Sequence, residues 1–152
     1  MTTTSRRAWL WSYAPLLIWV GVIFLLSSPG GSSANTSLII GPLLSFFFPD
    51  ITDASRETVH MLVRKTAHVT EYAVLAMIAF RAFSRSGFKL RWLLPVVLVA
   101  VVASLDEWNQ SFEPSRTSSP YDVLLDVCGG LLGLTLLAGF CFLGRWRRES
   151  TP

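Results

Sequence analysis

An unusually long stretch without charge constrains this chain most: no Asp, Glu, Lys or Arg occurs between Ala8 and Pro49. Within it, the apolar run from Trp9 to Leu26 is long enough, at about 1.5 Å per helical residue, to cross a hydrocarbon core of about 30 Å. Of the 152 residues, 51% are hydrophobic, which is more apolar than a soluble domain of this size. The sequence therefore predicts a membrane protein whose first span covers about residues 8–27.

A cleaved signal peptide is the competing interpretation of this first segment, because Arg6 and Arg7 precede the apolar run. The run is long, however, and it ends in SSPGGSS without a convincing small-x-small cleavage site. We therefore expect the segment to persist as a membrane span.

Three more stretches of less uniform sequence predict spans, at about residues 61–83, 92–110 and 121–143. Between the first and second spans, LIIGPLLSFFF (residues 38–48) is too short to cross the membrane, and Pro42 argues against a continuous helix there. The predicted fold class is an all-α membrane protein, namely a four-transmembrane-helix bundle with a re-entrant or interfacial segment between the first and second spans. No repeat or linker divides the chain, so we expect one domain.

The positive charges predict the orientation of the bundle. Nine of the thirteen Lys and Arg residues lie in three short segments, which are residues 6–7, 81–91 and 145–148. Such segments face the cytoplasm in most membrane proteins. We therefore expect a multi-pass protein of the cell membrane with both termini cytoplasmic. Cations scattered in this way do not form the basic face of a nucleic-acid-binding protein, so no nucleic-acid partner is expected.

Under this topology, ionisable side chains gather in the outer half of the bundle. Counted at about 1.5 Å per residue from the cytoplasmic helix ends, His68 and Asp106 both lie about 20 Å up. Glu71 lies somewhat lower, and Lys65 and Asp126 somewhat higher. Because a charge facing lipid costs at least about 2.5–3.5 kcal/mol, we expect these groups to face the bundle interior and one another.

Spacing along the helices supports the same grouping, since side chains one helical turn apart share a face. Three groups have this spacing: Lys65, His68 and Tyr72 with Glu71 beside them, then Asp106 with Gln110, and then Asp122 with Asp126. Each helix thus presents a polar stripe at its outer end above an apolar stem.

These residues also form motifs. Residues 65–72 read K-x-x-H-x-x-E-Y, residues 106–116 read D-E-x-x-Q-x-F-x-P-x-R, and the last predicted span begins with Asp122 and Asp126. In these three blocks the sequence resembles the VanZ-like family of small integral membrane proteins, named after a factor associated with low-level resistance to the glycopeptide teicoplanin. The resemblance runs from Leu16 to Gly133. It departs from the family pattern at Ser115, where Gly is common, and at Asp126, where Asn is frequent.

The resemblance and the spacing together define a candidate site in a single VanZ-like domain, residues 1–152. The candidate catalytic residues are His68, Asp106 and Glu71. The candidate ligand-binding residues are Lys65, Tyr72, Glu107, Gln110, Arg116, Asp122 and Asp126. No cofactor or metal is predicted, and Cys128 and Cys141 have the wrong spacing for zinc or a disulfide framework.

Three functions fit these features. In the first, an outward-facing site binds or processes an amphipathic envelope molecule, such as a lipid-linked precursor or a lipophilic glycopeptide. Arg116 and Lys65 would then hold an anionic group, while His68 with Asp106 or Glu71 would move a proton. In the second, the protein is a proton-coupled transporter, which requires polar residues down to the cytoplasmic side. In the third, the polar cluster only orders the helices.

Simpler roles remain for individual residues. Asp122 could only cap the last helix. Gly129 and Gly133 form a G-x-x-x-G spacing that allows a neighbouring helix to pack closely and is weak support for dimerisation, so the oligomeric state stays open. No P-loop, G-x-S-x-G, H-E-x-x-H or G-x-G-x-x-G motif is present, and enzymatic activity therefore stays an open question.

Overall fold

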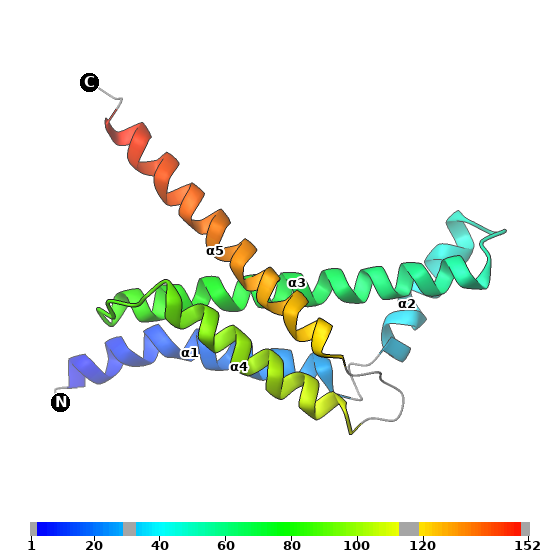
Figure 1. The fold of residues 1–152 in the computed structure, drawn as a ribbon, viewed down its shortest axis with the longest axis horizontal. Coiled ribbons are helices and arrows are strands. Elements are labelled where there is room, and N and C mark those ends of the chain that lie inside the picture. The colour runs from blue at the N-terminus through cyan, green and yellow to red at the C-terminus, as the bar shows by residue number, and fades with distance from the viewer. Residues whose placement is uncertain (1–2, 29–32, 113–118, 150–152) are drawn as a thin grey trace.

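The computed structural model describes residues 3–28, 33–112 and 119–149, with side chains described over residues 9–28, 40–112 and 119–144. Within these ranges the chain forms five α-helices and no strand (Figure 1). They are α1 (Thr3–Ser27), α2 (Ser33–Phe47), α3 (Asp53–Arg85), α4 (Leu93–Gln110) and α5 (Pro120–Glu149). In Figure 1, α1 begins and both α3 and α5 end toward the same end of the bundle.

The longest helix, α3, has 33 residues and contacts each of the other four. Its start is fixed by Thr52, whose side chain accepts a hydrogen bond from the Ser55 amide at 3.3 Å. At its other end Gly87 adopts a φ of 72°, and the Phe88 amide donates back to the Phe83 carbonyl at 3.2 Å. This is a Schellman ending, which glycine makes possible, and the edge-to-face contact of the Phe83 and Phe88 rings completes it.

Three segments are long and apolar enough to cross a membrane: Trp9–Ser27, Leu93–Gln110 and Pro120–Gly144. They match three of the four predicted spans closely. The remaining prediction, residues 61–83, falls inside α3, which is not one of the three because charged side chains such as Arg64, Lys65 and Glu71 interrupt its apolar sequence.

The segment predicted to be re-entrant or interfacial is different in form from the expectation. It lies in α2, a single 15-residue helix that continues through Pro42. The proline removes one backbone donor, but a helix tolerates the loss. The Ser45 hydroxyl adds a bond at 3.1 Å to the carbonyl of Gly41, beside the proline.

The apolar core lies where α1, α3, α4 and α5 meet. Fully buried members are Ile23 of α1, Leu75, Ala76 and Ala79 of α3, and Val99 and Ala103 of α4. Many small side chains allow the helices to approach closely, as expected for packing within a membrane. This core forms the apolar stem below the polar cluster.

The contact between α3 and α5 is closest at two glycines. Gly129 lies against the backbone of Val69, and Gly133 lies one turn further along against Ala73. The residue offset is 60 in both pairs (129 − 69 and 133 − 73), so the two helices run in the same direction. The G-x-x-x-G spacing therefore serves helix packing within one chain, and it determines which residues of α5 face α3. Figure 1 shows α5 crossing α3 with both helices directed toward the same end.

Candidate functional site

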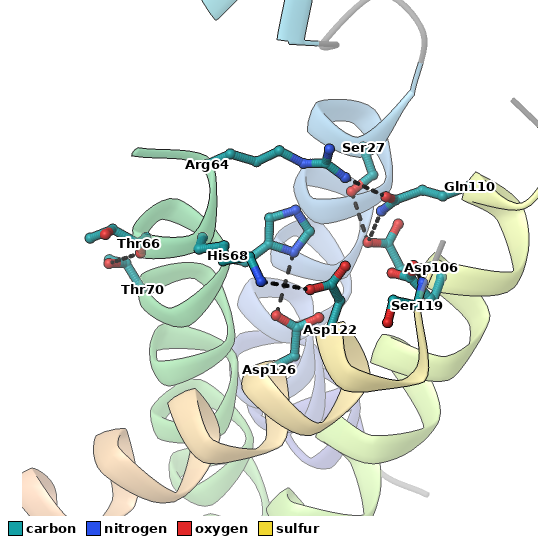
Figure 2. A network of polar contacts seen from close by, with 12 residues as sticks. Ser27, Arg64, Thr66, His68, Thr70, Asp106, Gln110, Ser119, Asp122 and Asp126 are labelled. Atoms are coloured by element: carbon teal, nitrogen blue, oxygen red, sulfur yellow. Dashed lines mark hydrogen bonds and ion pairs between the residues drawn. The ribbon is translucent and has the colours of Figure 1, made fainter. Parts of the chain in front are cut away.

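Polar side chains from four helices meet above the apolar core (Figure 2). They occupy the C-terminal end of α1, the middle of α3, the last turn and a half of α4 and the first two turns of α5. The helix packing described above turns these four segments toward one another. Buried polar groups in this number require hydrogen-bond partners, and most of them have one.

Asp106 of α4 is the centre of one branch of this network and is only 1% exposed. Its Oδ2 accepts hydrogen bonds from the Ser27 hydroxyl and from the Gln110 side-chain nitrogen, both at 2.9 Å. The other end of the Gln110 amide accepts a bond from Arg64 Nη2 at 3.1 Å. A continuous chain of hydrogen bonds thus connects α1, α4 and α3 (Figure 2).

One lysine–carboxylate ion pair and one histidine–carboxylate contact, which is ionic when the histidine is protonated, connect α3 and α5 one turn apart. His68 Nδ1 lies 3.4 Å from Asp126 Oδ1, with side chains 14% and 2% exposed. Lys65 Nζ lies 3.4 Å from Asp122 Oδ1, with side chains 48% and 24% exposed. The second pair is nearer the surface and precedes the first along both helices, which follows from their parallel course.

Glu107 forms the third part of the network. Its side chain is almost buried, and its Oε1 accepts a hydrogen bond from the Ser119 amide, just before α5 begins. This bond joins the end of α4 to the start of α5.

A cavity of about 1050 Å³ opens between these helices. Its ionisable lining comes from α3, α4 and α5 and comprises Glu57, His60, Arg64, Lys65, His68, Glu107, Asp122 and Asp126. Further lining residues extend along the first turns of α3, from Ala54 to Met61. Ligand pockets in proteins typically measure about 300–1000 Å³, so the space suffices for a substantial polar group.

The structure brings most of the predicted site residues together, some lining the cavity and others buried behind it. Five of them line the cavity: Lys65, His68, Glu107, Asp122 and Asp126. Asp106 and Gln110 are buried behind the cavity in the hydrogen-bond chain. Arg116 lies outside the described residues.

Glu71 and Tyr72 also lie behind the cavity wall. The half-buried carboxylate of Glu71 is close enough to His68, Asp106 and Asp126 to interact electrostatically. Tyr72 is fully buried, and its hydroxyl has no hydrogen-bond partner among the described residues. Its ring stacks near that of His68, with centroids 6.4 Å apart.

His68 was expected to lie within hydrogen-bond reach of Asp106 or Glu71, directly or through one water. The structure adds a different partner, because the carboxylate within 4.0 Å of His68 among the described residues is that of Asp126. Heights counted along separate helices cannot show which helices face each other. The glycines of α5 decide this, because Gly129 over Val69 places Asp126, three residues earlier, beside His68.

Sequence reasoning also missed Arg64. A usable signal existed, since Arg64 precedes His68 by four residues and so shares its helical face. Arg64 lies just before the motif that starts at Lys65 and was therefore not considered. Its side chain lines the cavity and donates a hydrogen bond to Gln110.

Chemically, the site can do two things. The cations of α3 and the carboxylates of α4 and α5 can hold charged groups of a ligand by charge-assisted hydrogen bonds. A histidine beside a carboxylate can also accept or deliver a proton. Among the described residues, no group of three or more His, Cys, Asp or Glu side chains has the arrangement of a metal site.

The fold and the cluster define an all-helical membrane protein that carries a polar site at one end of its bundle. The chain belongs to the VanZ/LLP1 family, whose sequence model matches residues 11–143, and this confirms the resemblance seen in the motifs. Comparisons with curated proteins and with solved structures give no significant match.

Proposed function

We propose that the cavity is an outward-facing site for the polar head of an amphipathic molecule of the cell envelope, such as a lipid-linked precursor or a lipophilic glycopeptide. One observation carries this proposal: a cavity of about 1050 Å³ with a charged lining lies at the end of helices that are long and apolar enough to cross a membrane. In this arrangement the polar part of a ligand enters the cavity while its apolar part stays in the lipid.

The proposed orientation has four crossings, with α3 as the second, and both termini in the cytoplasm. The three cationic segments then lie inside and the cavity lies outside. Exposed aromatic side chains of Trp108, Phe112 and Tyr121 surround the cavity end of the bundle. Such residues favour the head-group level of a bilayer, which supports placing the cavity there. In the same orientation α2, with exposed Phe46 and Phe47, rests on the outer leaflet without crossing it.

The core below the cluster argues against the transporter alternative. Past Tyr72 the buried positions of α3 are Ala73, Leu75, Ala76, Ala79 and Ala82, all apolar. A carrier of protons or polar solutes needs polar groups along its path, and beyond Tyr72 the described core has only the uncharged hydroxyls of Ser12 and Ser84 as buried side-chain polar groups.

The purely structural alternative fits one half of the cluster. The chain from Ser27 through Asp106 and Gln110 to Arg64 is buried and joins three helices, as an element that fixes helix register would be. The residues that line the cavity are different. A register-fixing role gives no reason for a cavity of this size beside Lys65, His68 and Glu107.

Native mass spectrometry of the protein, extracted with its surrounding lipid, tests this function. We expect the wild type to retain an amphipathic molecule that Asp126→Asn and His68→Ala lose. The control is Thr135→Ala, on the same helix as Asp126, whose exposed hydroxyl bonds only to the Leu131 carbonyl. Equal retention by all four proteins would contradict a binding site in the cavity.

The contact of His68 with Asp126 favours a second candidate function, in which the site also processes its ligand by proton transfer. In that case His68→Gln would bind the molecule but leave it chemically unchanged, and mass analysis of the bound species would show the difference. Identical bound species in wild type and His68→Gln would limit the function to binding.

A further inference from the structure

Among the described side chains that line the cavity, two charges of opposite sign are buried or half-buried and have no ionic partner; Glu57, which also lines the cavity, is exposed to solvent. Arg64 of α3 bonds through Nη2 to the neutral amide of Gln110, and Glu107 of α4 bonds through Oε1 to the backbone amide of Ser119. Within the described residues, neither charge has an opposite charge within 4.0 Å, because the ion pairs present are Lys65 with Asp122 and His68 with Asp126.

The two groups face the same space from neighbouring positions. Both line the cavity, and Gln110, which accepts the bond from Arg64, lies one helical turn beyond Glu107 on α4. Residues three apart on a helix have β-carbons about 5–6 Å apart. The positive and negative groups are therefore close, yet too far apart to neutralise each other directly.

From this arrangement we propose that the ligand of the cavity carries both charges: an anionic group that binds Arg64 and a primary ammonium that binds Glu107. This inference rests on the proposed binding function and names the class of its head group, a zwitterion of the phosphoethanolamine type. Such a head group places a phosphate and an ammonium only a few bonds apart.

Charge balance argues against a head group of a single sign. A purely anionic head group can bind Arg64 but leaves the nearly buried Glu107 carboxylate uncompensated next to it. A purely cationic head group can bind Glu107 but leaves the Arg64 guanidinium without an opposite charge. Removing water from an unpaired charge is strongly unfavourable, whereas a zwitterion supplies a partner to each.

The existing ion pairs favour the same conclusion. Displacing either Lys65 from Asp122 or His68 from Asp126 would leave a carboxylate without its partner. A zwitterion bound between Arg64 and Glu107 leaves both pairs in place. The ammonium needs N–H donors for the Glu107 carboxylate, so a trimethylated amine cannot replace it.

The test measures binding of defined lipids to the full chain, purified in detergent and freed of native lipid. The probes are dioleoyl phosphatidylethanolamine, the matching phosphatidylcholine and phosphatidylglycerol, and free phosphoethanolamine. We expect phosphatidylethanolamine to bind at least about tenfold more tightly than the other two lipids, because each of these lacks one of the two charge-assisted contacts. Binding of free phosphoethanolamine as well would identify the head group alone as sufficient, and its failure to bind would assign the site to the lipid.

Two variants separate the halves of the site. Arg64→Gln and Glu107→Gln should each weaken phosphatidylethanolamine binding about tenfold, whereas the matched control Arg85→Gln, an exposed cation at the far end of α3, should not. Circular dichroism confirms that each variant is folded, and the lipid ranking of the wild type needs no variant at all. Preference for phosphatidylglycerol or phosphatidylcholine would overturn the zwitterion while leaving the binding function intact. If no amphiphile binds preferentially, both the zwitterionic ligand and the proposed binding function are contradicted.

Discussion

Gly129 of α5 lies so close to Val69 of α3 that a β-carbon added to the glycine would come within 2.6 Å of the Val69 carbonyl oxygen. Gly133 repeats this contact against Ala73, where the corresponding distance is 2.5 Å. Both obstacles are backbone atoms, which cannot rotate away as a side chain does. The pairing of α3 with α5, and with it the position of Asp126 beside His68, depends on these two missing methyl groups.

We therefore predict that Gly129→Ala and Gly133→Ala each destabilise the protein by about 1–3 kcal/mol through overpacking. Gly139→Ala provides the control, because it lies on the same helix and a β-carbon there meets nothing within 4 Å. Thermal unfolding in detergent, followed by circular dichroism, measures the difference. Equal midpoints for all three variants would show that α5 packs elsewhere.

The hydrogen-bond chain predicts a second effect on stability. Ser27→Ala removes the bond from the end of α1 to Asp106 and should cost about 1 kcal/mol. The neighbouring Ser28, one residue beyond α1, donates its hydroxyl to the Leu25 carbonyl and forms no hydrogen bond to another helix among the described residues, so Ser28→Ala should be nearly neutral. The same unfolding measurement compares the two serines, and a larger loss for Ser28→Ala would be incompatible with the network.

The proposed orientation is testable by cysteine labelling in a variant with Cys128 and Cys141 replaced by alanine. A cysteine at the exposed Ser86, between α3 and α4, should react with a membrane-impermeant reagent only after the cells are opened. A cysteine at the exposed Ser111, at the end of α4, should react in intact cells. The reverse labelling pattern would mean that the bundle has the opposite orientation in the membrane. Reaction of both cysteines in intact cells would mean that α4 does not cross the membrane.

The family to which the chain belongs suggests a cellular test. If the ligand includes lipophilic glycopeptides, expression of the wild type should raise the minimal inhibitory concentration of teicoplanin, and His68→Ala or Lys65→Gln should abolish the increase. Immunoblotting of membranes verifies that the variants accumulate, and Thr135→Ala is again the control. Full protection by the cavity variants would mean that any such resistance arises outside the cavity.

The sequence was sufficient for three apolar spans and for some contacts of the cluster, for identifiable physical reasons, but it did not predict α2 as a helix or the first turns of α3. Apolar runs located the spans within α1, α4 and α5 to within a few residues, because hydrophobic length is a property of a single segment. The turn spacing of Asp106 and Gln110 correctly placed them in contact, since both lie on one helix.

Contacts between helices were harder to predict. The pairing of His68 with Asp126 depends on the register of α5 against α3, which two glycines determine through close packing. Pro42 shows that a local preference also has limited predictive value. Proline disfavours a helix, yet α2 continues through Pro42 because the helix tolerates the loss of one backbone hydrogen bond. The role of Arg64 was missed because the residue directly precedes the K-x-x-H-x-x-E-Y motif and was not considered part of the site.

The length of α3 has a consequence for how a ligand reaches the cavity. Its 33 residues extend about 50 Å, some 20 Å more than a hydrocarbon core of about 30 Å. In the proposed orientation, the first turns of α3 therefore rise past the lipid head groups while still lining the cavity from Ala54 to Met61. One wall of the cavity then reaches from the water into the bilayer. A molecule arriving from the cell wall and a molecule diffusing within the outer leaflet would meet the same row of side chains.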